Sequence, residues 1–336
     1  IMDLFQIPVV LFSFKRIDKT LLIVERLSKV KPQKLYIISD GGRTDEEWDK
    51  VNKCRSEIEA HIDWNCEVVK RYASCNIGVY ANIAGGVKWV FEQEEYAIFL
   101  EDDNLPALSF FPFCQEMLLK YKDDTRVLWI CGTNYLKSFS FPSDSSYYFT
   151  HHMMPCGWAS WSDKFNRFYD KDFSLWENPY IQEVLKNLPY DNLLRAQDIE
   201  NWNRELKRKK KGLKFDSWDY QMSFSLRVHG LYGIVPKYNQ ITNIGVDLDS
   251  IHGGSSFDNI MTRRFCGLPT QELEFPLKHP LAVQADSEYE KATAHIITMP
   301  LSYRLKSKIS NFLKRLFRID MEESFTKTMH KRFFRL

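Results

Sequence analysis

The first 133 residues alternate between short apolar runs and segments with helical periodicity. Residues 8–14 form a continuous apolar run, residues 18–30 carry apolar side chains at helical spacing, and residues 35–38 form a second apolar run. A strand, a helix and a second strand are thus complete within about 40 residues, which is typical of a βαβ unit. Continuous apolar runs suit parallel strands that are covered on both faces. We therefore predict an α/β fold with a mostly parallel, doubly wound sheet and helices on both of its faces.

The alternation continues to residue 133 and then stops. We expect further strands over residues 67–69, 96–100 and 127–130, and helices over residues 46–62, 82–91 and 110–121. Residues 134–160 are rich in Ser, Phe and Tyr without a clear period, and we expect residues 156–161 to form a turn. Farther on, the pattern predicts helices over residues 191–211 and 215–229 and a strand over residues 232–236. The chain therefore divides into a regular first part and a less regular second part.

Three consecutive carboxylates, Glu101, Asp102 and Asp103, follow the apolar run at residues 96–100. Carboxylates at the end of a buried strand repel one another, and unpaired buried charge is costly. A divalent cation would offset this repulsion, and Mg2+ and Mn2+ take oxygen ligands. Open α/β sheets also bind ligands at the carboxyl ends of their strands. We interpret the triplet as part of a metal and nucleotide site; a solvated acidic turn is the alternative that these residues alone leave open.

The composition of the 336 residues suits a packed globular protein. Hydrophobic residues make up 44% and aromatic residues 15%, and a net charge of +2 gives no indication of nucleic-acid binding. The seven cysteines are odd in number and include no CxxC pair, which argues against a disulfide framework or a zinc site and favours a reducing compartment. No apolar run approaches the roughly 18 residues of a membrane span, and the first residues do not look like a secretory signal. We therefore expect a cytoplasmic protein.

The last part of the chain has a basic amphipathic pattern. One helical face carries Leu301, Leu305, Ile309, Phe312, Leu313, Leu316 and Phe317, and the other positions carry Arg304, Lys306, Lys308, Lys314, Arg315 and Arg318. Such a helix is typical of membrane surfaces, and basic segments are attracted to anionic lipid. We therefore expect residues 301–336 to contact the inner face of the plasma membrane peripherally. Packing of this helix on its own domain or on a second subunit is the alternative.

Seven short motifs occur in a fixed order along residues 7–256. They are Pro8–Arg16, Ser39–Gly41, Asn76–Gly78, Leu100–Asp103, Gly157–Trp161, Asp216–Asp219, and Asn243–Gly245 followed by Ile251–Gly253. With these motifs the chain resembles glycosyltransferases of the GT-A fold, in particular the bacterial HlpA-like group related to family 2 enzymes, and it is also similar to the N-acetylglucosaminyltransferase I family. The resemblance implies one GT-A (Rossmann-like) domain, with a donor-binding half in residues 1–133 and an acceptor-binding, catalytic half in residues 134–280. Residues 281–336 lie outside the resemblance, as a basic helical extension.

The resemblance implies a metal-dependent inverting transferase that moves a hexosyl or N-acetylhexosaminyl group from a nucleotide-sugar to a hydroxyl of a bacterial surface glycan, such as an O-antigen, a capsule or a lipid-linked precursor. UDP is the expected nucleotide because it is the commonest one in these families. A bound Mn2+ or Mg2+ would stabilise the charge on the departing diphosphate. Matching positions make Asp103 the metal ligand and place His252 within reach of the metal or the diphosphate. Asp102 and Glu101 would contact the ribose and the sugar.

The rest of the implied donor site lies in the first part of the chain. Asp40, with Gly41 and Asn76, matches the position that holds the base, and Arg16 would touch the base or a phosphate. A helix cap is the alternative for Asp40, and a surface charge is the alternative for Arg16.

The implied acceptor side lies in the second part of the chain. Asp219 matches the general base that takes the proton of the acceptor hydroxyl, and Asp216 is the second candidate. One of these two carboxylates is expected to cap the helix instead, which Asp does well. Gly157, Trp158 and Trp161 would line the acceptor pocket, although tryptophan more often fills a core.

Two other functions stay open at this point. A sugar-phosphate nucleotidyltransferase shares this sheet architecture, but it would need a glycine-rich phosphate loop after the first strand, and residues 12–16 contain no glycine. A non-catalytic glycan-binding or assembly protein on a GT-A fold is the other alternative, because a fold does not fix a function. Residues 137–150 and 204–211 match nothing in the resemblance, so the acceptor and the linkage are not predicted.

Overall fold

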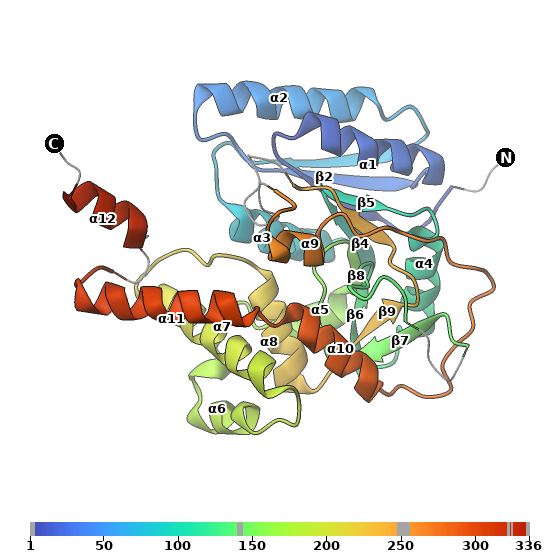
Figure 1. The fold of residues 1–336 in the computed structure, drawn as a ribbon. Coiled ribbons are helices and arrows are strands. Elements are labelled where there is room, and N and C mark those ends of the chain that lie inside the picture. Colours follow the sequence, from blue (N-terminus) through green and yellow to red (C-terminus); the bar gives the residue numbers. More distant parts are fainter. Residues whose placement is uncertain (1–3, 140–143, 247–255, 321–322, 324, 334–336) are drawn as a thin grey trace. The chain divides into compact units, whose positions relative to one another are not determined.

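The computed structural model of the chain describes residues 4–139, 144–246, 256–320, 323 and 325–333. The chain forms two compact units, residues 1–295 and residues 296–336, which we call the first and second units and describe separately. Figure 1 shows their helices and strands.

A mixed central sheet organises the first unit. Eight strands of the described residues pair in the order β3-β2-β1-β4-β8-β6-β9-β7. Their bounds are β1 (Val9–Ser13), β2 (Lys34–Ser39), β3 (Glu67–Tyr72), β4 (Tyr96–Glu101), β6 (Val127–Cys131), β7 (Tyr147–Thr150), β8 (Trp158–Trp161) and β9 (Tyr232–Pro236). Only β8 and β7 pair antiparallel with their neighbours in this sheet. The other six described strands run in one direction, so the predicted mostly parallel α/β sheet is confirmed.

Helices cover both faces of this sheet. They include α1 (Ile17–Val30), α2 (Asp45–Ala60), α3 (Val79–Phe91), α4 (Phe110–Lys120) and α5 (Ser162–Phe168). On one face, Leu11 and Ile37 share a buried cluster with side chains of α1, α2 and α4. On the other face, the ring of Phe99 lies 6.3 Å from Phe12 and 5.3 Å from Phe91 of α3. The alternation of inward side chains along each strand therefore produces two apolar faces, as the continuous apolar runs indicated.

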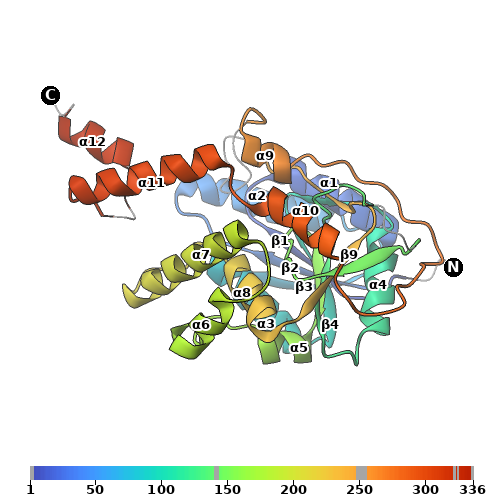
Figure 2. The ribbon, with the colours of Figure 1, turned by 60° about the horizontal axis from the view of Figure 1, so that its bottom comes forward.

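A group of helices lies beside the sheet in the second half of the first unit. It consists of a 3-10 turn (Leu175–Glu177), α6 (Pro179–Lys186), α7 (Asn192–Lys210) and α8 (Asp219–His229) (Figure 2). Three buried rings hold it together, because Trp202 lies 5.2 Å from Trp176 and 5.1 Å from Phe224. This aromatic contact fixes α8 on α7 and thereby sets the position of the first residue of α8.

The strand β8 corrects the turn that we expected over residues 156–161. Trp158–Trp161 insert antiparallel between β4 and β6, and only Gly157, with φ of 59°, has a turn conformation before them. A four-residue strand is too short to show a period of two, so the local pattern did not reveal it. β8 fills the position between the two parallel parts of the sheet.

A second, two-stranded sheet lies immediately after the acidic triplet. β5 (Asn104–Pro106) pairs antiparallel with β10 (Ile241–Asn243), and Asn104 lies opposite Asn243. The backbone of Ile244 continues this contact, because its N–H donates to the carbonyl of Asp103 at 2.8 Å. This small sheet brings residues 241–245 against the carboxyl end of β4.

The first unit extends beyond residue 280, where we expected the C-terminal extension to begin. α10 (Ser287–Ile297) is anchored there by Tyr289, which is fully buried and whose hydroxyl donates to Oδ1 of Asn134 at 3.2 Å. The carboxylate of Glu290 also accepts a hydrogen bond from the hydroxyl of Thr150. Along the chain, the short helix α9 (Ile260–Phe265) comes between β10 and α10.

The second unit consists mainly of α11 (Leu301–Leu316) and α12 (Phe325–Phe333). The ring of Phe317 lies 6.0 Å from that of Phe325, which joins the two helices. No helix within the described ranges of the chain is both long and apolar enough to cross a membrane.

Candidate functional site

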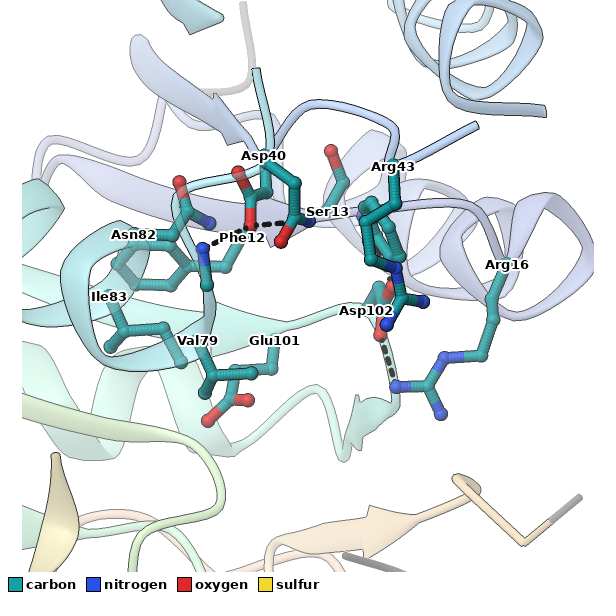
Figure 3. A pocket seen from close by; sticks show the side chains of 13 residues that line it. Phe12, Ser13, Arg16, Asp40, Arg43, Val79, Asn82, Ile83, Glu101 and Asp102 are labelled. Atoms are coloured by element: carbon teal, nitrogen blue, oxygen red, sulfur yellow. Dashed lines mark hydrogen bonds and ion pairs between the residues drawn. The ribbon is translucent and has the colours of Figure 1, made fainter. Parts of the chain in front are cut away.

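A cleft of about 290 Å3 opens at the carboxyl ends of β1, β2 and β4 (Figure 3). Its lining residues are Phe12, Ser13, Phe14, Arg16, Asp40, Arg43, Asn76, Gly78, Val79, Asn82, Ile83, Glu101 and Asp102. This is the edge at which open α/β sheets bind ligands, and the volume is close to the lower end of the range of small-molecule sites. Eight of the 13 lining residues are polar or charged, and Phe12, Phe14, Val79 and Ile83 supply most of the remaining wall.

Two uncharged polar side chains on the cleft wall are almost fully buried. Ser13 is 4% exposed and Asn82 is 7% exposed. The hydroxyl of Ser13 has no hydrogen-bond partner among the residues that the structure describes. A buried polar group without a partner is rare in proteins and calls for an explanation, and a ligand bound in the cleft would supply one. Neither residue was among the predicted site residues, and their places at the end of a strand and within a helix were the only local indications.

Asp40 joins two loops at the edge of the cleft. Its Oδ1 accepts the backbone N–H groups of Gly41 and Ile77, both at 2.8 Å, and its Oδ2 accepts the N–H of Gly78 at 3.0 Å and the amide of Asn76 at 3.1 Å. These four bonds tie the loop after β2 to the loop before α3. A Cβ at Gly41 would overlap the backbone of Cys75, so the close approach of the loops requires glycine.

The structure thus brings together the predicted base-binding residues Asp40, Gly41 and Asn76. All four hydrogen-bonding positions of the Asp40 carboxylate are already used within the protein. Arg43, which the sequence analysis did not select, also lines this part of the cleft, and its guanidinium lies 5.8 Å from the ring of Phe14. Its position directly after the Asp40–Gly42 turn is the one feature of the sequence that could have indicated its place in the cleft.

Arg16 bridges two members of the acidic triplet. Its Nη2 lies 2.9 Å from Oδ1 of Asp102 and 3.1 Å from Oδ2 of Asp103, and the first of these ion pairs is drawn in Figure 3. The backbone N–H of Phe14 also donates to Oδ2 of Asp102 at 3.3 Å. The two carboxylates therefore form a pair that holds a cationic group between them.

Asp102 of the acidic triplet is buried, and its neighbours Glu101 and Asp103 are partly buried. Burial raises the pKa of Asp102 to about 7, against the opposing effect of the positive charge of Arg16. The pKa of Glu101 lies well above its usual range, first because of burial and then because of the negative charges of Asp103, Asp102 and Asp219. The carboxyl of Glu101 therefore holds its proton more tightly than an ordinary glutamate does.

Asp103 is held from several sides. The amide of Asn104 donates to its Oδ1 at 2.7 Å, and Oδ1 of Asn104 in turn accepts the N–H of Gly157 at 2.8 Å. A Cβ at Gly245 would overlap Oδ2 of Asp103, so this glycine permits the close approach of the chain after β10. The motifs at residues 157 and 243–245 therefore converge on one carboxylate. Asn104, which is 1% exposed, positions the carboxylate of Asp103, and it was not among the predicted site residues.

Asp219, the first residue of α8, lies in the same charged cluster although it comes from the second half of the unit. Its negative charge is among the causes that raise the pKa of Glu101. Burial is the main reason that the pKa values of Tyr135 and Tyr169 are raised, and the charge of Asp219 is a smaller cause for both. Its Oδ1 is buried and has no hydrogen-bond partner within the described part of the chain. This carboxylate oxygen is therefore left without a donor among the described residues.

Asp216, the second candidate base, has structural partners instead. Its Oδ1 lies 3.0 Å from Nη2 of Arg208, its Oδ2 lies 3.8 Å from Nε of Arg204, and its N–H donates to Glu205 at 3.0 Å. These contacts fix the chain before α8 on α7. No side chain caps α8, so the expectation that Asp216 or Asp219 would do so is wrong.

The two tryptophans that we expected in an acceptor pocket lie in the core. The ring of Trp158 is sandwiched at 4.0 Å between Phe99 and Trp129, and Trp161 is fully buried and donates its indole N–H to the carbonyl of Leu118 at 2.9 Å. Rings enclosed in this way have no open face for a sugar, since β8 is an interior strand. Gly157 contacts Asn104 through its N–H, as described above, and lies next to Ile241.

The residues of this cluster fit a hard divalent cation. Mg2+ is commonly held by one or two carboxylates together with substrate phosphates, and Asp102 and Asp103 supply two carboxylates that already pair with a cationic group. Nowhere in the described ranges do three or more His, Cys, Asp or Glu side chains form a metal site by themselves. The remaining predicted ligand, His252, lies outside the described residues.

Comparisons with known proteins concern the fold alone. No protein-family model and no curated protein matches the chain. Among solved structures, it is similar to a cytidylyltransferase from Leptospira borgpetersenii (TM-score 0.33, 11% identity, 55% of this chain and 74% of that chain). It is also similar to a UDP-glucose pyrophosphorylase in complex with UDP-glucose (0.35, 11%, 71% and 93%) and to a 4-diphosphocytidyl-2C-methyl-D-erythritol synthase from Anaerococcus prevotii (0.35, 9%, 70% and 91%). Similarity at this level carries no argument about activity.

Proposed function

We propose that the protein is a metal-dependent inverting glycosyltransferase that moves a sugar from a nucleotide-sugar, a UDP-sugar in the first instance, to a hydroxyl of a bacterial surface glycan. One relationship carries the proposal: Oδ1 of Asp219 is buried without a partner among the described residues, and the charge of Asp219 is among the causes that raise the pKa of Glu101 in the acidic triplet beside the cleft. Sugar transfer needs both cation-binding carboxylates for the donor diphosphate and a separate carboxylate for the acceptor. The motif order described above supports the same assignment.

The donor would occupy the cleft. Its nucleoside would lie against Phe14 and Val79, with the hydroxyl of Ser13 and the amide of Asn82 as its polar partners. Arg16 and Arg43 would contribute positive charge toward the diphosphate.

Asp102 and Asp103 would hold the divalent cation, Mn2+ or Mg2+, with Asn104 fixing the orientation of Asp103. When bound, the cation would supply Lewis-acid stabilisation of the charge on the leaving diphosphate. Arg16, which pairs with both carboxylates, would be released toward the phosphates.

Asp219 would act as the general base for the acceptor hydroxyl. Its Oδ1 has no hydrogen bond to the described residues that proton transfer would break. Asp216 is the weaker candidate because Arg208, Arg204 and Glu205 already use its polar groups or backbone.

A nucleotidyltransferase is the second candidate function, because a cleft with two cation-pairing carboxylates also suits attack on a nucleoside triphosphate. The two reactions leave different products. Glycosyl transfer, or slow hydrolysis of the donor in its place, releases a nucleoside diphosphate. Nucleotidyl transfer releases pyrophosphate and in reverse converts a nucleotide-sugar and pyrophosphate into a sugar phosphate and a nucleoside triphosphate.

The test is a product assay with UDP-, GDP- and dTDP-sugars, each with Mn2+, Mg2+ or EDTA. Metal-dependent release of a nucleoside diphosphate from one donor supports the glycosyltransferase. Formation of a nucleoside triphosphate only when pyrophosphate is added supports the nucleotidyltransferase. Absence of both products and of any metal-dependent nucleotide binding would favour a non-catalytic glycan-binding protein.

A further inference from the structure

The helix α11 of the second unit presents an apolar stripe that the described residues of that unit leave exposed. Five apolar side chains are exposed by half or more: Leu301 (60%), Leu305 (50%), Ile309 (60%), Phe312 (65%) and Leu316 (62%). At about 100° per residue they fall within an arc of roughly 80° on the helix. The helix buries none of its residues. Scattered exposed leucines need no explanation, but a contiguous stripe of this kind marks an interaction surface.

The charge of the same helix is of one sign. Residues 301–316 contain five basic residues, Arg304, Lys306, Lys308, Lys314 and Arg315, and no acidic residue. Arg304, Lys308 and Arg315 fall along one border of the apolar stripe when the same rotation per residue is applied. An apolar stripe bordered by lysine and arginine matches a surface with an apolar interior and an anionic rim.

From this face we infer a docking site for an anionic lipid bilayer, with α11 lying in the plane of the headgroups. The charge of α11 favours lipid over a second copy of the chain. A self-paired α11 would bring together two helices with five positive charges each, which repel, whereas anionic headgroups neutralise them. This inference is independent of the proposed transferase activity.

Vesicle flotation with the full-length chain tests the inference. One set of vesicles contains phosphatidylcholine alone, and the other contains equal parts of phosphatidylcholine and phosphatidylglycerol. We expect the chain to partition at least about tenfold more strongly to the anionic vesicles, and we expect high salt to reduce this partitioning.

Two double variants with uncharged substitutions distinguish the contribution of the apolar stripe to vesicle binding from that of the rest of α11. Ile309→Gln with Phe312→Gln removes the middle of the stripe and should lower partitioning to anionic vesicles at least about tenfold, since each side chain loses its burial in lipid. Ser307→Gln with Ser310→Gln, on the polar side of the same helix, should partition as the wild type does. Circular dichroism checks that both variants keep their helix content.

Three outcomes would overturn the inference. The first is equal or absent partitioning of the wild type with both kinds of vesicle. The second is a wild-type dimer in light scattering that only the Ile309→Gln, Phe312→Gln variant splits, which would assign the stripe to a second copy. The third is a lower unfolding free energy of that variant in the absence of lipid, which would assign the stripe to packing within the chain.

Discussion

The amide nitrogen of Asn104 donates a hydrogen bond of 2.7 Å to Oδ1 of Asp103. This bond fixes the carboxylate that closes the acidic triplet. Because Oδ1 of Asn104 also accepts the N–H of Gly157, one buried side chain orients a metal-binding candidate and joins β5 to the start of β8. The loss of this side chain should therefore be felt both in metal-dependent binding and in stability.

Asn104→Ala is expected to lower the unfolding free energy by about 1–3 kcal/mol, because it leaves the buried N–H of Gly157 without its acceptor. It should also weaken Mn2+-dependent nucleotide binding about tenfold. Urea denaturation and Mn2+ titration in the presence of a nucleoside diphosphate measure the two effects. Asn166→Ala, which removes an exposed asparagine of α5, is the control and should change neither by more than about 0.5 kcal/mol. Normal Mn2+ dependence in Asn104→Ala would contradict the positioning role.

Asp102→Asn is expected to stabilise the metal-free protein in a pH-dependent way. The folded-state pKa of Asp102, about 7, lies above the usual value of a free aspartate. Between about pH 4 and about pH 7 the unfolded chain therefore binds fewer protons than the folded chain, and the wild type loses stability as the pH rises. The asparagine variant lacks this loss, so its advantage in unfolding free energy should grow with pH across that window.

Urea unfolding of wild type and Asp102→Asn at several pH values, in EDTA, measures this difference. The values below about pH 3, where the carboxyl is largely protonated in both the folded and the unfolded state, give the baseline. A difference that stays constant with pH, or one that shrinks as the pH rises, would show that Asp102 is ionised in the folded protein throughout.

Asp219→Asn should reduce sugar transfer by about 100- to 10,000-fold while leaving nucleotide binding unchanged, because a general base contributes on this scale and the amide cannot accept the proton. Asp216→Asn is the matched control on the same segment, and it should retain transfer because its carboxylate pairs with Arg208 and Arg204. Steady-state kinetics and nucleotide binding by calorimetry separate the two steps. An active Asp219→Asn enzyme beside an inactive Asp216→Asn enzyme would exchange the two roles.

Ser13→Ala and Ser160→Ala should behave in opposite ways although both hydroxyls are buried. The hydroxyl of Ser13 has no partner in the described residues, so its removal should leave stability unchanged or raise it by about 1 kcal/mol and should weaken nucleotide binding several-fold. Ser160 donates to the carbonyl of Leu128 at 2.7 Å, so its removal should cost about 1 kcal/mol and leave nucleotide binding intact. Equal nucleotide affinity in both variants would remove Ser13 from the binding site.

The sequence predicted the regular first half of the fold because β1, β2 and β4 are continuous apolar runs and amphipathic helices alternate with the strands. It did not predict β5, β7, β8 or β10, since strands of three or four residues that pair antiparallel with distant partners show no local period. The same reason explains why Trp158 and Trp161 were expected in an acceptor pocket although they lie in the core. Their residue type suits a pocket and a core equally, and only the insertion of β8 between β4 and β6 decides for the core.

The residues of the candidate site also differ in how well the sequence alone predicts them. The acidic triplet stands out locally, because three carboxylates after an apolar run have few structural explanations. Asn82 and Arg43 do not stand out, because an amide within a helix and an arginine after a turn are common on surfaces. Their contribution to the cleft depends on which loops meet at the sheet edge, and this is a property of the packed chain rather than of any segment.

The four hydrogen bonds that Asp40 accepts from the two neighbouring loops bear on how the cleft would take up a ligand. One carboxylate couples both loops, so neither can rearrange without disrupting the other. The wall that they form is preorganised, and little backbone entropy is left to lose when a ligand enters. Most of the ordering on binding would then fall on the ligand itself, which favours small molecules that already hold a compact shape.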